Sequence, residues 1–111
     1  MRTLEFEVKG QMLEKKEGSD FSGLVAGTDG YLQAKFLFKG NEWRDCIKAA
    51  SFFSDGVEYA AILDSNNTCV IPKEALTRRR FSVSITGIRK GFKIKTNRTD
   101  VKQEVSSYEF R

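Results

Sequence analysis

Short segments of alternating apolar and polar residues, separated by turn signals, run through almost the whole chain. Near the start, Leu4, Phe6 and Val8 alternate with polar neighbours, which is the two-residue period of a strand with one buried face. A similar alternation or a short apolar run recurs at residues 31–38, 46–53, 57–63, 68–71, 80–88, 92–96 and 101–105. Residues 21–25 allow one more short strand. The pattern predicts an all-β chain.

The turns between these segments favour two stacked antiparallel sheets. Asp55-Gly56 separates two apolar runs and is a strong hairpin signal. A single helical turn is expected near 72–76, because Pro72 suits a first helical position and good helix formers follow it. Seven or eight short strands predict an immunoglobulin-like antiparallel β-sandwich, with a small closed barrel as the second choice. At 111 residues, the chain fits one domain spanning residues 1–111.

The inward-facing positions of these segments form the predicted core. Phe92 and Ile94 are also assigned to an inward-facing set, opposite the lysines of the same strand. The main core residues are expected to be Leu32, Phe36, Ile47, Tyr59, Leu63, Val70, Phe81, Val83 and Ile85.

Reactive side chains are scarce, which argues against an enzyme. The chain contains no histidine, the commonest general base, and no metal-ligand or phosphate-loop motif. Asp29, Asp55 and Asp64 all lie in turn signals, where aspartate hydrogen-bonds its own backbone. Cys46 and Cys69 lie in strand-like runs and are expected to be buried free thiols. We therefore expect no catalytic residues, no metal and no cofactor.

Positive charge is concentrated in one part of the chain. The net charge is +4, yet residues 72–98 carry nine basic side chains against Glu74 alone. This concentration predicts one basic patch that contacts an acidic partner, more readily a protein than nucleic acid. Trp43 is expected mainly to seal the core, with a role in partner binding as the alternative. The candidate partner-binding residues are Arg78, Arg79, Arg80, Arg89, Lys90, Lys93, Lys95, Arg98 and Trp43.

The order of segments from Tyr31 onward resembles small β-sandwich modules encoded in phage and prophage tail and baseplate gene clusters. These include the amino-terminal modules of upper baseplate proteins. The resemblance covers about two thirds of the chain. It rests on Tyr31-Leu32-Gln33-Ala34-Lys35-Phe36, Trp43, Lys48-Ala49-Ala50-Ser51-Phe52, Tyr59, Leu63-Asp64, Cys69-Val70-Ile71-Pro72-Lys73-Glu74-Ala75-Leu76, Phe81-Ser82-Val83-Ser84-Ile85-Thr86-Gly87 and Thr96-Asn97.

The resemblance implies a non-enzymatic structural or adaptor protein that docks on other phage structural proteins. The alternatives are a small inhibitor of a host factor, or a nucleic-acid-binding protein that uses the basic segment 78–98. Association of the chain with copies of itself is a further alternative. The start of the chain lacks a signal-peptide pattern and no run is long enough for a membrane span. We expect no membrane partner, synthesis in the host cytoplasm and, for a structural role, a place in the virion.

Overall fold

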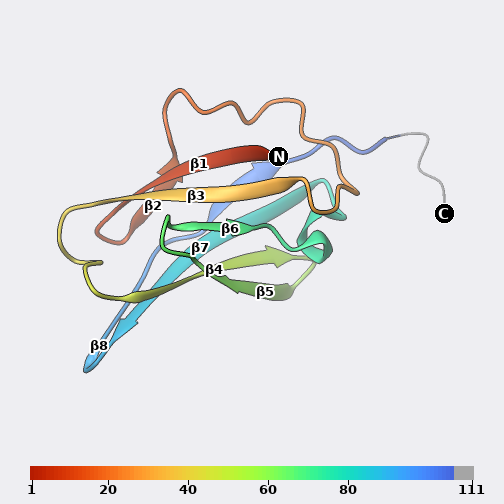
Figure 1. The fold of residues 1–111 in the computed structure, drawn as a ribbon. Helices are drawn as coiled ribbons and strands as arrows, with labels where there is room; N and C mark the ends of the chain where they lie inside the picture. The colour runs from red at the N-terminus through yellow and green to blue at the C-terminus, as the bar shows by residue number, and fades with distance from the viewer. Residues whose placement is uncertain (107–111) are drawn as a thin grey trace.

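Two β-sheets packed face to face form the protein. The computed structural model describes residues 1–106. The strands are β1 (Arg2–Lys9), β2 (Met12–Lys15), β3 (Leu32–Lys39), β4 (Ile47–Ser54), β5 (Val57–Ile62), β6 (Thr68–Val70), β7 (Arg80–Arg89), β8 (Phe92–Lys95) and β9 (Thr99–Lys102), with a 3-10 turn η1 (Lys73–Leu76) after β6. One sheet has the order β2-β1-β3-β6 and the other β5-β4-β7-β8 (Figure 1). The described strands form an all-β sandwich and do not close into a barrel, which confirms the first fold prediction.

The first sheet contains a parallel pair that the antiparallel prediction did not include. β1 and β3 are parallel over their whole length, from Arg2 opposite Leu32 to Lys9 opposite Lys39. The β1–β2 hairpin reverses the chain, and residues 16–31 then carry it back to the end where β1 begins. β3 therefore starts beside the start of β1, with the Arg2 amide donating to the Tyr31 carbonyl at 2.9 Å.

The second sheet is built on the hairpins that the sequence predicts. β4 and β5 meet at Asp55-Gly56, where both residues have positive φ, 53° and 78°. Glycine adopts this conformation at low cost and aspartate tolerates it, so the pair fits a tight two-residue hairpin. β7 pairs along one side with β4, and along the other with β9 at its start and β8 at its end. β7 is therefore the central strand of this sheet.

Most of the predicted core is buried between the sheets. Two assignments are wrong: Ile47 is 69% exposed and Val70 is 48% exposed. In both strands the alternation points these residues outward, since Ala50 and Phe52 in β4, and Cys69 beside Val70, take the inward positions. Tyr59 packs against the core from a half-buried position. The six other predicted core residues are buried: Leu32, Phe36, Leu63, Phe81, Val83 and Ile85.

The segment between β2 and β3 differs from the prediction. Residues 21–25 do not form a strand; Phe21 packs edge-to-face on Phe6 at 5.3 Å between ring centroids, and Val25 makes only an isolated bridge to Glu104. β2 is an additional short strand in a stretch expected to be irregular, which raises the strand count to nine. The last strand covers residues 99–102 rather than 101–105, because the chain pairs with the start of β7 directly after residue 98.

Both cysteines are free and buried, as the sequence predicts. Burial raises the pKa of the Cys69 thiol from 9.0 to about 12, and the nearby Asp64 carboxylate adds to the effect. The thiolate is the reactive form, so Cys69 is expected to be almost inert at pH 8.

We expect a thiol reagent at pH 8 to leave Cys69 unmodified in the native protein and to modify it after denaturation. Peptide mass spectrometry of the two samples measures the difference. Because the raised pKa favours the neutral thiol in the folded state, the contribution of Cys69 to stability should be intact below pH 9 and should decline as the pH rises from 9 toward 12. Rapid native labelling of Cys69 at pH 8 would contradict the burial seen in the fold.

Candidate functional site

The outer face of the second sheet carries the most distinctive surface among the described residues. It consists of the side chains of β5, β4, β7 and β8 that point away from the first sheet. These are Glu58, Ala60 and Ile62 from β5; Ile47, Ala49, Ser51 and Phe53 from β4; Ser82, Ser84, Thr86 and Ile88 from β7; and Lys93 and Lys95 from β8. The centre is built of small residues, so the larger side chains at the two ends decide what this face can contact.

Three exposed isoleucines gather at one end of the outer face. Ile47 lies directly opposite Ile88, and Ile62 is opposite Ala49, two residues along β4 on the same side of the sheet. Their exposed fractions are 69% for Ile47, 51% for Ile88 and 72% for Ile62. We call these three residues the isoleucine cluster. An exposed cluster of large apolar side chains with charged neighbours is typical of a protein-binding surface.

Two of the predicted basic residues border the isoleucine cluster. Lys93 is directly opposite Ile88, and Lys95 is opposite Thr86 on the same face. Both lysines are exposed. Within the part of the chain that the structure describes, neither has a carboxylate within salt-bridge distance. This end of the face therefore combines apolar area with two available positive charges.

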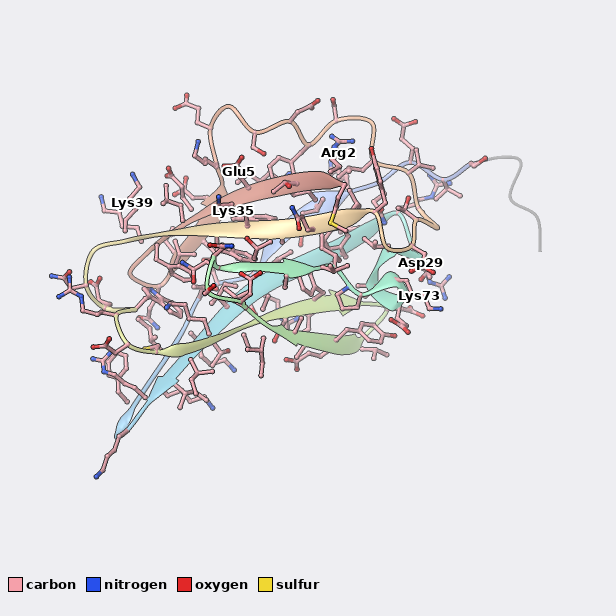
Figure 2. The ribbon with its side chains drawn as sticks, viewed as in Figure 1. Arg2, Glu5, Asp29, Lys35, Lys39 and Lys73 are labelled. Carbon is pink, nitrogen blue, oxygen red and sulfur yellow. The ribbon has the colours of Figure 1, made fainter. Side chains whose placement is uncertain are left out.

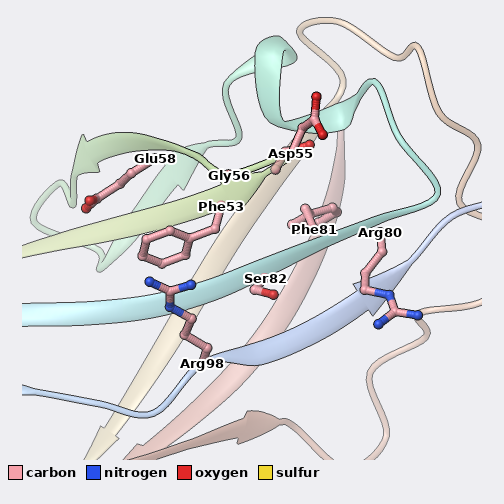
Figure 3. Close-up of a pocket in the computed structure, with 9 residues that line it drawn as sticks. Phe53, Asp55, Gly56, Glu58, Arg80, Phe81, Ser82 and Arg98 are labelled. Carbon is pink, nitrogen blue, oxygen red and sulfur yellow. The ribbon is translucent and has the colours of Figure 1, made fainter.

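The opposite end of the outer face is a charged hollow of about 420 Å³ near the β4–β5 turn. Figure 3 shows Arg98 with its guanidinium lying over the Phe53 ring, 3.6 Å from the ring centroid. The Glu58 carboxylate accepts a hydrogen bond from the Ser51 hydroxyl at 2.6 Å. Stacking on Phe53 holds Arg98 in place while its outer N–H groups remain available to a carboxylate.

The three consecutive arginines lie at this charged end and are partly engaged. Arg78 pairs with Asp55 at 3.1 Å, and Arg80 pairs with Asp100 at 3.7 Å. All four side chains are more than half exposed, so each pair contributes little to stability but reduces the local positive charge. Arg79 is exposed beside them.

Arg89 is a structural residue rather than a free surface charge. It is half-buried at the end of β7, where one guanidinium nitrogen donates to the Glu42 and Arg44 carbonyls at 3.1 Å each. The same group stacks on the Phe92 ring, 3.8 Å from the centroid. Arg89 thus ties the loop before β4 to the β7–β8 hairpin. The sequence carries no signal for this role, because it depends on a contact between residues more than 40 positions apart.

The basic residues of segment 78–98 do not gather into one patch, which corrects the prediction. β7 runs from Arg80 to Arg89, so its ends are about 30 Å apart at the rise of an extended strand. Arg78, Arg79 and Arg80 are at one end, whereas Arg89 and the exposed Lys90 are at the hairpin tip. A strand separates in space the charges that are close in the sequence.

Trp43 is buried, which matches the core-sealing role expected for it. The indole is 1% exposed, and its N–H donates to the Gly10 carbonyl at 2.8 Å. Its six-membered ring lies against Gly87, where a Cβ atom would come within 2.7 Å of Trp43 Cε3. Glycine inside β7 therefore makes room for the indole, a placement that a glycine within a strand can indicate. Trp43 offers almost no surface to a partner in this structure.

The half-buried aromatic rings near the basic residues are already covered. Phe92 and Ile94 face away from Lys93 and Lys95, as predicted; Ile94 packs against the core cluster, whereas Phe92 lies beyond it, beneath Arg89. Phe53 lies beneath Arg98. A nucleic-acid base stacks on an open aromatic face, so these rings do not offer a ready platform for bases.

The outer face of the first sheet carries more charge, and its exposed apolar residues Met12, Leu37 and Val70 are opposite polar residues rather than one another. Glu5 and Lys35 are opposite one another on β1 and β3, as Figure 2 shows, and Lys39 pairs with Glu7 at 3.8 Å. Alternating charges of this kind are typical of a solvated surface. Lys35 is therefore a suitable position for control substitutions.

Comparison with known proteins adds no assignment to this geometry. No protein-family model matches the chain, and no curated protein gives a significant match. Among residues 1–106, no group of three or more cysteine, aspartate or glutamate side chains is arranged to hold a metal ion. No helix in the described range has the length and apolar character needed to cross a membrane.

Proposed function

We propose that the chain is a non-enzymatic binding protein that acts through protein–protein contacts, as a structural or adaptor component of a phage or prophage particle. The observation that carries the proposal is the isoleucine cluster bordered by Lys93 and Lys95. The resemblance to tail and baseplate modules supplies the biological setting. The partner is a protein surface with an apolar centre and acidic neighbours.

Exposure of the isoleucine cluster to water favours its burial against a partner. Burying an exposed isoleucine side chain against a partner removes apolar surface from water, which is worth about 25 cal/mol for each Å². Lysines at the rim add attraction to acidic groups and speed association. At the other end of the face, the N–H groups of Arg98 can bind a further carboxylate of the partner. A protein with an acidic surface therefore fits the whole face better than a nucleic-acid backbone, which would gain nothing from the isoleucines.

Site-specific photo-crosslinking tests the proposal. A photoreactive amino acid at Ile88 is expected to give one discrete protein adduct in cells that produce the particle, and the protein should be present in purified particles. The same amino acid at Lys35, on the opposite sheet, should give no such adduct. An adduct to a particle protein supports the structural role, whereas an adduct to a host protein with the chain absent from particles would transfer support to an inhibitor.

Nucleic acid is the competing partner class. If generic DNA or RNA bound tightly at physiological salt, with affinity falling log-linearly as salt increases, phosphate contacts would dominate and the protein-binding proposal would be overturned. We expect no gel shift under those conditions.

A further inference from the structure

β5 is an edge strand whose outer backbone groups have no partner strand among the described residues. Ser54 and Val57 flank the two-residue turn and exchange both backbone hydrogen bonds. Along the β4–β5 ladder, such hydrogen-bonded pairs alternate with pairs that are not hydrogen-bonded to each other. Leu63 and Lys48 are a hydrogen-bonded pair at the far end of the same ladder, since the Leu63 amide donates to the Lys48 carbonyl at 2.9 Å. The N–H and C=O groups of the intervening residues Glu58, Ala60 and Ile62 therefore point away from β4. An edge of this kind is a template for another strand.

β8 forms the opposite edge of the same sheet. Arg89 and Phe92 flank its two-residue turn, so the alternation directs the N–H and C=O groups of Lys93 and Lys95 outward. Of these four groups, the Lys95 carbonyl accepts from the Gln11 side chain at 3.1 Å. The tip of the β7–β8 hairpin projects from the body of the molecule (Figure 1), which leaves the edge open at Lys93, whereas beyond Lys95 the β1–β2 turn reaches the edge, with the Asn97 amide donating to the Gln11 carbonyl at 3.1 Å.

The two edges carry opposite charges on the same face. The β5 edge displays Glu58, with Asp55 and Asp64 in the turns at its two ends, whereas the β8 edge displays Lys93 and Lys95. A lysine on an edge strand normally discourages strand pairing. Opposite a carboxylate it becomes favourable, since opposite charges facing each other across a strand pair stabilise it.

The strand directions allow the two edges to join. β5, β4, β7 and β8 alternate in direction, so β5 and β8 are antiparallel to each other within one molecule. A second copy that is displaced sideways, without being turned over, therefore presents β8 antiparallel to β5 with both outer faces on the same side. In the register that places Lys95 opposite Glu58, Lys93 falls opposite Ala60. In this register Lys93 and Ala60 exchange both backbone hydrogen bonds, and the Lys95 amide donates to the Glu58 carbonyl while the Lys95 carbonyl keeps its hydrogen bond from Gln11. The register also brings the Glu58 carboxylate to the Lys95 ammonium.

We propose that the chain assembles head to tail with copies of itself, β5 of one copy pairing with β8 of the next to continue a single antiparallel sheet. The interface is heterologous, so it leaves an unused β5 edge and an unused β8 edge on each assembly, and growth continues unless the copies close into a ring. The isoleucine cluster stays on the outer face of the extended sheet. Because Lys93 and Lys95 border the cluster and also form the β8 edge, Ala60→Pro, which changes neither the isoleucines nor these lysines, is the variant that tests the edge pairing separately from the partner proposed for the cluster.

Complementary variants test this arrangement in the full chain. Ala60→Pro removes an outward N–H from β5 without touching the β4 ladder, and Pro is tolerated on an edge strand when its missing N–H faces solvent. The double change Lys93→Glu and Lys95→Glu reverses the charge of the β8 edge. By sedimentation velocity, the unaltered chain is expected to show growing species as its concentration rises, whereas each variant alone stays monomeric. An equimolar mixture of the two variants should form a dimer, because each retains one functional edge.

A charge exchange distinguishes pairing of these edges from non-specific attraction. Glu58→Lys alone and Lys95→Glu alone should each weaken self-association about tenfold. The two changes in one chain should restore it, whereas Lys35→Glu should have no effect.

A chain that stays monomeric at all concentrations, or variants that associate as well as the unaltered chain, would overturn the proposal. If the unaltered chain self-associates but the equimolar mixture of the two variants forms no dimer, the head-to-tail pairing would be overturned. Circular dichroism confirms that each variant is folded.

Discussion

Replacing Trp43 by alanine is expected to lower the free energy of unfolding by about 3–5 kcal/mol. The indole is fully enclosed between Phe38, at 5.2 Å between ring centroids, and Gly87 of β7. Its loss would leave a large cavity at one end of the sandwich. The Gly10 carbonyl would also lose the hydrogen bond that fixes the β1–β2 turn against this end.

Urea unfolding followed by circular dichroism measures this effect, since the variant has no tryptophan to report by fluorescence. Trp43→Phe is the matched control, because it keeps an aromatic ring and loses the N–H donor. The free energy of unfolding of Trp43→Phe should lie between those of the unaltered chain and of Trp43→Ala. A loss below about 1 kcal/mol for Trp43→Ala, the size expected of an ordinary substitution, would show that the indole does not seal the core.

Replacing Phe81 by alanine is expected to cost about 3–5 kcal/mol as well. Phe81 is 1% exposed on the central strand β7 and packs against Phe52, with 6.3 Å between ring centroids. β7 is held on both sides by other strands, so the surrounding backbone has little freedom to close the cavity.

Phe53→Ala provides the comparison for Phe81, because Phe53 is on the neighbouring strand but points to the outer face. Its ring is half-buried beneath Arg98, and its loss should cost about 1 kcal/mol, in the range of a cation–π contact plus partial burial. Equal losses for the two variants, measured by urea unfolding, would contradict the assignment of inner and outer faces.

The alternation of apolar residues was sufficient to predict the sandwich and most of its core. It placed Phe36, Phe81 and Ile85 correctly, because strands with one buried face report their orientation directly. It failed in β4, where apolar residues occupy both faces: Ile47 was assigned to the core although it belongs to the outward set. That failure concealed the isoleucine cluster, since an exposed apolar residue in such a run cannot be told from a buried one by pattern alone.

The candidate site was less predictable than the fold. Lys93 and Lys95 could be placed on one face because they alternate with Phe92 and Ile94 within a single strand. The roles of Arg89 and of the three consecutive arginines depend on contacts with distant segments, such as Arg78 with Asp55. The sequence shows how much charge a segment carries, whereas the strand geometry decides whether those charges lie together.

The edge pairing has a physical consequence for the outer face. If copies join through β5 and β8, the isoleucine clusters recur along one continuous sheet, and a partner with repeated sites would bind it with higher avidity than a single copy. The two proposals are therefore compatible, although each is tested by separate variants.

The isoleucine cluster is proposed to bind a partner rather than to support the fold. The most direct test changes Ile47, Ile62 and Ile88 to serine together and measures two quantities in the same variant. We predict that each substitution lowers the free energy of unfolding by no more than about 1 kcal/mol, because the side chains are at least half exposed and lose only cross-strand contacts. We also predict that the partner adduct, followed through a photoreactive amino acid at Thr86 on the same face, is lost. An adduct of unchanged yield, or a variant that unfolds, would contradict the claim.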